Sequence, residues 1–307
     1  MDNPEEKKGY PLDFVIQKFF EEKDRTCRSA TIRDYENLLK NILEFFKSGT
    51  IINNLKKMDI KNYENFRLLN GAKEGLLIKE LKLLKSIFNF AEENEFIDNN
   101  FFRSYNFLKI YHNYEKRERF LTPEECQRLI NNANPYLQRL IIFLLETGMR
   151  INETLNLYFS DITPYTIDRL GNKIKVFTLR VRPEISKSKK ERFIPLSIDA
   201  MEQVKKQKID FPNSMFIFTD SKGNYYKTTP KKAFETARNK SNLKGVSFHT
   251  LRHTCATLKN KGLNYKGVFI GKKDKELIKK ILGHSDLKIT DGYIHNNSID
   301  DLIDFIE

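Results

Sequence analysis

The beginning of the chain carries apolar side chains at helical spacing. Residues 11–22 show this periodicity, and residues 31–47 repeat it through a stripe of aliphatic and aromatic positions. A third, longer helix is predicted over 72–94, where leucines three and four positions apart form one face and lysines partly surround it. No alternating pattern competes with these stripes, so this part of the chain is predicted to be helical.

A polar segment at 111–120, YHNYEKRERF, follows the helical part. It lacks an apolar stripe and precedes a helix start in which Thr122 is the N-cap and Pro123 the first helical residue. The segment suits a flexible connection and a contact with a phosphate backbone equally well. We expect a first domain, a basic linker and a second domain, at 1–114, 115–120 and 121–307.

The second domain is predicted to mix helices with a small sheet. The run LQRLIIFLL at 137–145 predicts a helix buried on most sides, Gly148 ends it, and another helix is expected over 151–158. Residues 174–181 and 192–196 are rich in β-branched and aromatic side chains and predict strands joined by a Lys/Ser turn. Further helices are expected near Pro230, near His249 and over 274–282. The predicted fold class is mainly α with a small antiparallel β-sheet.

The charge balance points to a polyanionic partner. Lys and Arg number 54 against 41 Asp and Glu, which gives a net charge of +13. Nucleic acid is the first candidate, although a soluble surface in a Lys-rich proteome produces the same balance. The three cysteines are far apart and odd in number, which favours neither a disulfide framework nor a zinc module. Without a signal-peptide core or a long apolar run, a cytoplasmic location is expected.

Four motifs in the second domain carry residues suited to chemistry on phosphate esters. They are TGMRINE at 147–153, SKSKKER at 186–192, HTLR at 249–252 and LGHSDLKITDGYIH at 282–295. In this order they resemble the motifs of the tyrosine recombinases, the phage integrase family, and especially its two-domain Xer-like members. The resemblance covers residues 120–296. Each motif is common by chance, but four in the right order form a specific signal.

The resemblance implies a catalytic set and one supporting acid. The catalytic set is Arg150, Lys187, His249, Arg252, His284 and Tyr293, and the supporting residue is Glu153. Arginine forks grip phosphate oxygens bidentately and stay charged, and a phenol can attack the phosphorus. Imidazole carries protons near neutral pH, so His249 suits the phenolic proton. His284 would add a hydrogen bond to the phosphate. Lys187, matched among three lysines of the turn, would protonate the departing 5′ oxygen.

The same resemblance implies an activity and an assembly. A helical, SAM-like core-binding domain and an α+β catalytic domain would form a site-specific DNA recombinase that works through a 3′-phosphotyrosyl intermediate and a Holliday junction. The task would be integration or excision of a mobile element, or chromosome dimer resolution. Four protomers on two DNA sites would exchange C-terminal helices, with accessory proteins as further partners, and neither cofactor nor metal is implied. DNA contacts are assigned to Lys189, Lys190, Arg192, Lys231, Lys232 and Arg238.

Alternative interpretations exist for the site and for the whole protein. His249 and His253 have the spacing of a zinc pair, but Thr250 follows the first histidine and no third ligand is evident. A catalytically silent DNA-binding protein on the same fold would be expected to have lost a catalytic side chain, and none is missing. A type IB-like relaxing enzyme would act as a monomer on any sequence.

One segment departs from the family pattern. Thirty-one residues separate Arg252 from His284, more than in compact relatives, and the extra length falls at 262–276. An inserted loop is predicted here. Its role is open between a structural elaboration, an extra DNA contact through its lysines and a contact between protomers.

Overall fold

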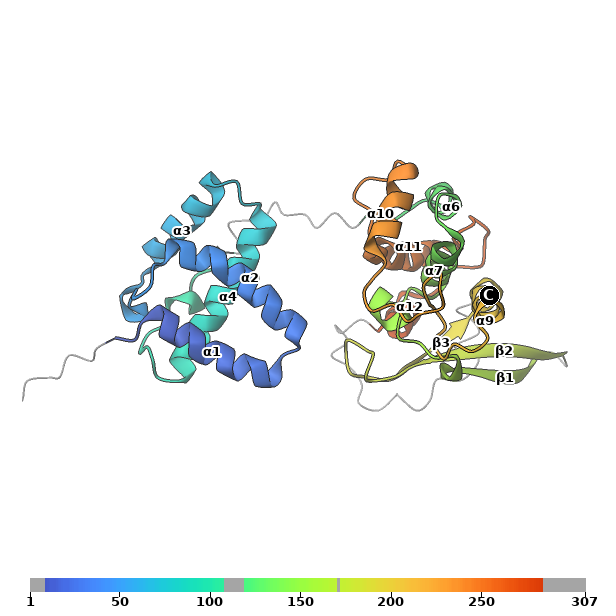
Figure 1. Cartoon of the computed structure of the whole chain (residues 1–307), viewed down its shortest axis with the longest axis horizontal. Helices are drawn as coiled ribbons and strands as arrows, with labels where there is room; N and C mark the ends of the chain where they lie inside the picture. Colours follow the sequence, from blue (N-terminus) through green and yellow to red (C-terminus); the bar gives the residue numbers. More distant parts are fainter. Residues whose placement is uncertain (1–8, 108–118, 170–171, 284–307) are drawn as a thin grey trace, which may run out of the picture. The chain divides into compact units, whose positions relative to one another are not determined.

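The computed structural model describes residues 9–107, 119–169 and 172–283, and the chain divides into two compact units, residues 1–116 and 117–307 (Figure 1). Each unit contains an apolar core of its own. The described residues are mainly helical and include one three-stranded antiparallel sheet, so the predicted fold class is confirmed. Within these ranges, no helix combines the length and the apolar character needed to cross a membrane.

In the described residues of the first unit, three helices pack against a long fourth one. They are α1 (Leu12–Thr26), α2 (Ser29–Phe45), α3 (Lys57–Leu69) and α4 (Glu74–Glu93), with short 3-10 turns at Ile52–Asn54 and Phe101–Arg103. Helix α4 contacts the other three because its leucine stripe, including Leu77, Leu81 and Leu84, is fully buried. The three helices expected from periodicity are present, whereas α3 was not predicted.

A buried polar network explains why the apolar periodicity did not predict α3. Glu80 on α4 is fully buried and accepts hydrogen bonds from Tyr63 Oη at 2.7 Å and from Arg67 Nε at 3.0 Å. Both donors lie on α3 and are themselves buried. A helix whose inner face contains an arginine that pairs with a buried carboxylate has a weak apolar stripe, although its packing is complete.

The second unit surrounds α7 with helices and places a sheet at one side. The helices are α6 (Pro123–Asn131), α7 (Pro135–Thr147), α8 (Ile151–Thr154), α9 (Ile198–Asp210), α10 (Lys231–Lys240), α11 (Phe248–Lys261) and α12 (Lys275–Leu282), with a 3-10 turn at Phe159–Asp161. Helix α7 contacts α6, α9 and α11, which confirms the buried helix expected at 137–145. Thr122 caps α6 as predicted, because its hydroxyl accepts from the Glu125 N–H at 3.3 Å.

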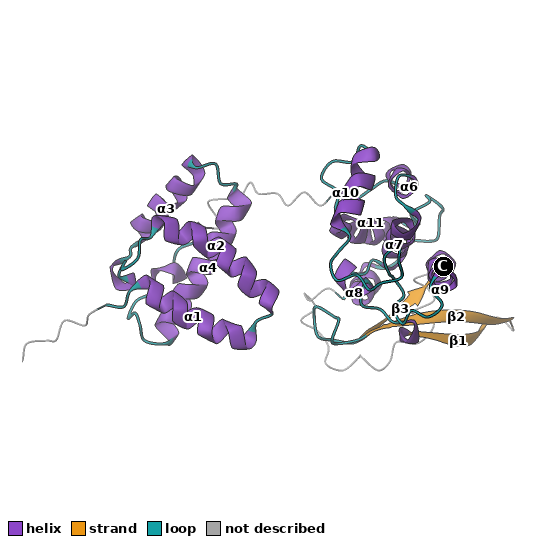
Figure 2. Ribbon diagram, in the orientation of Figure 1, coloured by secondary structure: helices purple, strands orange, loops and turns teal. Residues whose placement is uncertain are grey.

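The sheet has the strand order β1-β2-β3, with β1 at Ile162–Arg169, β2 at Asn172–Val181 and β3 at Arg192–Leu196 (Figure 2). Leu179 pairs with Ile162 on one side and with Ile194 on the other. Strand β3 contacts α7, α9 and α12. The end of the β2–β3 connection therefore lies beside α12.

One expected helix is much shorter than predicted. The helix expected over 151–158 ends at Thr154. Beyond it, Leu157 O accepts from Ile217 N at 2.9 Å and Phe159 N donates to Met215 O at 3.1 Å. These residues pair with a distant segment, because that pairing buries Leu157 while satisfying its backbone.

The inserted segment after α11 folds back on its own unit. Leu263 and Phe269 form an isolated antiparallel bridge, and Tyr265 between them is buried. The Lys266 ammonium lies 2.7 Å from the Asp199 carboxylate of α9. These contacts support the first of the three roles considered for this loop, a structural elaboration.

Candidate active site

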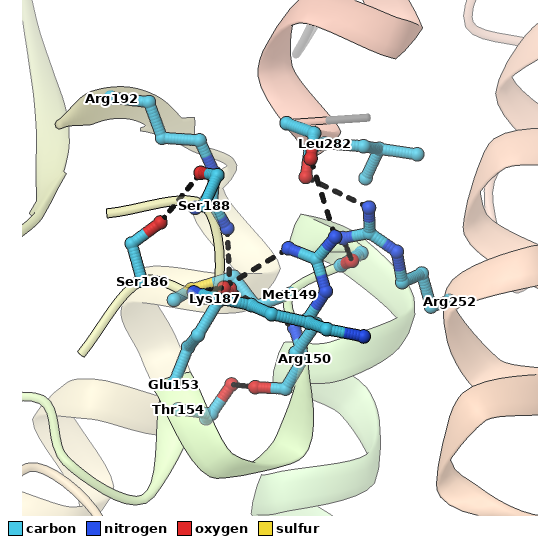
Figure 3. A network of polar contacts seen from close by, with 12 residues as sticks. Met149, Arg150, Glu153, Thr154, Ser186, Lys187, Ser188, Arg192, Arg252 and Leu282 are labelled. Carbon is cyan, nitrogen blue, oxygen red and sulfur yellow. Dashed lines mark hydrogen bonds and ion pairs between the residues drawn. The ribbon is translucent and has the colours of Figure 1, made fainter. Parts of the chain in front are cut away.

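Helix α7 ends so that an arginine and a glutamate face each other. Gly148 adopts the left-handed conformation, with φ of +64°, and Arg150 follows at the N-cap of α8. The Arg150 Nη1 donates to Glu153 Oε1 at 3.1 Å, one turn along. Glu153 is only 1% exposed, so its carboxylate is held inside the unit and directed at the cationic groups around it (Figure 3).

The second arginine of the site comes from α11. His249 lies exposed in the first turn of this helix, and Arg252 three residues later is 3% exposed. Residues three apart lie on neighbouring positions of one helix surface. Arg252 Nη1 donates to Gly148 O at 2.8 Å, which ties α11 to the end of α7.

Three arginines meet at the C-terminal end of α12. They donate to three successive carbonyls: Arg192 Nε to Ile281 O at 3.1 Å, Arg252 Nη2 to Leu282 O at 2.8 Å, and Arg150 Nη2 to Gly283 O at 3.3 Å. The last carbonyls of a helix lack partners within the helix and carry partial negative charge, so guanidinium groups are suitable caps. His284 is the next residue in the sequence and lies outside the described residues.

The β2–β3 connection brings a lysine to the same place. The Lys187 N–H donates to Glu153 Oε1 at 3.4 Å, and its side chain is exposed. Figure 3 shows this side chain reaching from the connection toward Arg150. Lys189 occupies the left-handed region with φ of +54°, and Lys190 is exposed beside it. Of the three lysines, Lys187 is the one whose backbone is bonded to the carboxylate of the cluster.

Arg192 occupies a position that the sequence did not reveal. It is the first residue of β3, its side chain is 9% exposed, and its Nη2 pairs with Glu153 Oε2. The remaining Nη1 is buried and meets no hydrogen-bond partner among the described residues. Sequence reasoning grouped Arg192 with surface cations, although its place at the end of the hairpin motif and the start of a strand was a usable signal.

The cluster carries more positive than negative charge. Burial by itself would raise the pKa of Glu153, but Arg192 and Arg150 hold it below its ordinary value of 4.5. Burial, together with the charges of Arg150 and Arg192, lowers the pKa of Arg252 from 12.5 to about 10. Three guanidinium groups against one carboxylate favour an anionic ligand, because such a ligand relieves the repulsion among them.

The other cations assigned to DNA contact are dispersed. Lys231 and Lys232 are exposed at the start of α10, where they line an open hollow with Asn152, Thr228 and Thr229. The two threonines were not singled out from the sequence, and their only signal was that they precede these lysines. Arg238 is partly buried on the same helix and donates to Val246 O at 3.4 Å.

Two predicted catalytic residues, His284 and Tyr293, lie outside the described residues, as does the C-terminal helix expected to be exchanged. The rings of His249 and His253 are 4.6 Å apart at their centroids. Across the described part of the chain, no group of three or more His, Cys, Asp or Glu side chains is placed to hold a metal ion.

The arrangement is suited to binding a phosphate ester without a metal. Arg150 and Arg252 each have donors on guanidinium nitrogens that are fixed by protein carbonyls, so their orientation is set before a ligand arrives. The exposed Lys187 side chain lies at the edge of the cluster, where it can deliver a proton to a departing oxygen.

Comparisons with known proteins give one consistent family. A family model described as the phage integrase family matches residues 119–299. A tyrosine recombinase of Thermosipho africanus is 28% identical over 299 residues, covering 92% of this chain and 95% of that protein. Tyrosine recombinase XerC of Oceanobacillus iheyensis is 25% identical and covers 92% of each chain. A lambda integrase tetramer bound to a Holliday junction gives a TM-score of 0.68 at 18% identity, covering 96% of this chain and 82% of that chain, and this likeness shows the fold.

Proposed function

Because the chain belongs to the phage integrase family, the family of the tyrosine recombinases, we propose that it cleaves and rejoins duplex DNA at specific sites through a 3′-phosphotyrosyl intermediate. The observation that carries the proposal is the convergence of Arg150, Arg192 and Arg252 on the end of α12, directly before His284. Phosphoryl transfer needs positive charge where negative charge develops on the non-bridging oxygens. Two of these arginines also stand at the positions that the family motif assigns to phosphate binding.

The reaction is a transesterification in which no cofactor takes part. The Tyr293 oxygen attacks phosphorus, its proton passes to His249, and the bond to the 5′ oxygen breaks. Lys187 gives a proton to that leaving oxygen, so a free 5′ hydroxyl and a phosphotyrosine result. Rejoining is the reverse, with a 5′ hydroxyl attacking the phosphotyrosine. The roles of Tyr293 and of His284 rest on residue order, and those of Arg150 and Arg252 are also supported by the geometry.

DNA binding is assigned to both units. The helical unit at 1–114 would clamp one side of the duplex, and the catalytic unit at 121–307 would hold the other, with residues 115–120 following the backbone between them. Contacts from Lys189, Lys190, Lys231, Lys232 and Arg238 would be mainly to phosphates, so binding weakens with salt.

The proposed active form is a homotetramer on two recombination sites that passes through a Holliday junction. The tetrameric lambda integrase structure with a Holliday junction supports this form by similarity of fold. The C-terminal segment, NNSIDDLIDFIE, would dock in a neighbouring protomer, since a helix this short is marginal alone. The cellular task would be integration or excision of a mobile element, or resolution of chromosome dimers.

Covalent trapping tests the proposal and identifies the DNA site. Protein–DNA adducts are recovered from cells under denaturing conditions, and the attached DNA is sequenced. Wild-type protein should yield adducts that share a core sequence, and Tyr293→Phe should yield none. Adducts that persist with Tyr293→Phe would overturn the assignment of the nucleophile, and reads scattered without a common core would overturn site specificity.

Assembly is tested on the recovered core. Sedimentation of the protein with two such duplexes should give a four-protomer complex. A monomer that relaxes supercoiled DNA of any sequence would instead identify a relaxing enzyme.

A further inference from the structure

Arg192 joins two parts of the site that are far apart in the sequence. Its Nε donates to Ile281 O at 3.1 Å, and its Nη2 pairs with Glu153. Gly283 makes room for this side chain, since a Cβ atom there would lie 3.2 Å from Arg192 Cδ and 3.3 Å from its Nε. The guanidinium therefore lies directly against the last turn of α12.

Glu153 extends the connection to the rest of the site. One carboxylate oxygen pairs with Arg192, and the other accepts from Arg150 Nη1 at 3.1 Å and from the Lys187 N–H at 3.4 Å. The Glu153 side chain is 2% exposed, so water does not compete for these bonds. A buried, multiply bonded carboxylate is a rigid point of attachment for each group that it touches.

We propose that Arg192 is a positioning residue of the strand-transfer reaction, which fixes Lys187 relative to Arg150 through Glu153 and holds the hairpin against the end of α12. The inference rests on the proposed function and reassigns Arg192 from contact with DNA. A side chain that is 9% exposed, with two nitrogens bonded to protein, is placed to orient other groups. Lysine is a poor replacement, because its ammonium is a point charge on a flexible stem, whereas the planar guanidinium directs separate nitrogens at the carboxylate and the carbonyl in a fixed geometry.

The test compares Arg192→Lys with Arg139→Lys in the full-length protein. Arg139 is a matched control, because it is a partly buried arginine that pairs with Asp210 at 2.7 Å between α7 and α9. The probe is a nicked duplex that contains the core recovered by covalent trapping. Arg192→Lys should bind it with unchanged affinity and form the covalent adduct roughly 100-fold more slowly, as expected for a misplaced catalytic group. Arg139→Lys should react like the wild type.

A second substrate separates positioning of Lys187 from a general loss of structure. In it, sulfur replaces the bridging 5′ oxygen at the cleaved bond, and a thiolate leaves without the proton that lysine supplies. On this duplex, the ratio of the wild-type rate of adduct formation to the Arg192→Lys rate should be at least tenfold smaller than on ordinary DNA. An equal defect on both substrates, or no defect on either, overturns the inference.

A further variant keeps the test informative if Arg192→Lys folds poorly by circular dichroism. Glu153→Gln breaks the same connection from its other end, and it should show the same selective recovery with sulfur. The double variant should be no slower than the slower single variant, since both act through one connection; additive defects overturn the inference. If wild-type protein forms no adduct, the proposed function itself fails, whereas an active wild type with an unaffected Arg192→Lys rejects only the positioning role.

Discussion

Gly148 and Leu282 lie in such close contact that a Cβ atom at position 148 would come within 2.3 Å of Leu282 Cδ2. Gly148 also has φ of +64°, so a side chain there meets both backbone strain and a packed neighbour. Gly148→Ala should lower the free energy of unfolding by about 3 kcal/mol, from the left-handed backbone and from overpacking together. Urea denaturation measures this change.

Gly245→Ala is the control for the backbone contribution. Gly245 has φ of +70°, but nothing lies within 4 Å of a Cβ atom there. This variant should therefore lose only about 1–2 kcal/mol. If both variants lose the same free energy of unfolding, the Leu282 side chain moves aside without an energetic penalty, and the contact does not hold the end of α12 in place.

Lys187 should behave as the general acid of the turn. Its N–H bonds to Glu153, whereas Lys189 lies in the left-handed turn beyond it. Lys187→Ala should slow cleavage of ordinary DNA by about 10²- to 10⁴-fold, and replacing the leaving 5′ oxygen by sulfur should restore most of the rate. Single-turnover adduct formation on the two duplexes measures both values.

Lys189→Ala and Lys190→Ala provide the comparison. Both side chains are exposed, and we expect their loss to weaken DNA binding without any preference for the sulfur substrate. Selective recovery with Lys189→Ala in place of Lys187→Ala would move the general acid two residues along the turn.

Glu153 should contribute stability that disappears in acid. Arg192 and Arg150 hold its folded pKa below 4.5 despite the opposing effect of burial. Its ionised form therefore stabilises the protein fully above pH 4.5, and this contribution is lost as the pH falls through the lowered folded value. At pH 7, Glu153→Gln should lower the free energy of unfolding by about 3 kcal/mol, because it leaves a buried arginine without its counter-charge. The difference in free energy of unfolding between the variant and the wild type, measured by urea denaturation, should become smaller below pH 4.5.

Glu191→Gln is the matched control for this pH dependence. Glu191 pairs with Arg180 on the same hairpin, but their side chains are 35% and 52% exposed. The expected loss is about 0–1 kcal/mol at pH 7. The assigned role of the buried carboxylate would be contradicted if the difference in free energy of unfolding between Glu153→Gln and wild type stayed constant from pH 7 to pH 3.

The sequence was most informative where apolar side chains alone determine an element. Helix α4 and helix α7 were predicted because most of their buried positions are leucine, isoleucine or phenylalanine, and the start of α6 was predicted from its N-cap Thr122. Helix α3 was missed because Glu64 and Arg67 share its buried face with apolar residues. A periodicity argument treats charge as exposed and fails where charge is paired inside.

The same limit applies to the candidate site. Motif order identified Arg150, Lys187 and Arg252, and the structure brings all three to one cluster with Glu153. The two arginines also donate to backbone carbonyls of residues 148, 282 and 283, and a carbonyl has no sequence signature. The pairing of Arg192 with Glu153 could not be predicted either, because it spans 39 residues and depends on how the sheet packs beside α12.

The hollow at the start of α10 should bind the DNA backbone. Lys231 and Lys232 are exposed there beside Thr228 and Thr229, so two ammonium groups face solvent together. Replacing both lysines by alanine should weaken binding to cognate and unrelated duplexes alike, since phosphate contacts carry no sequence information. The slope of log K against log salt should become shallower by about 2, close to one unit for each lysine.

Lys206→Ala is the control for a general loss of charge. Lys206 lies on α9 and pairs with Glu202 at 2.7 Å, so its ammonium already has a partner within the protein. We expect its removal to leave the salt slope almost unchanged. Because counterion release counts only phosphates that are actually neutralised, equal slopes for the α10 double variant and wild type would show that this hollow faces away from bound DNA.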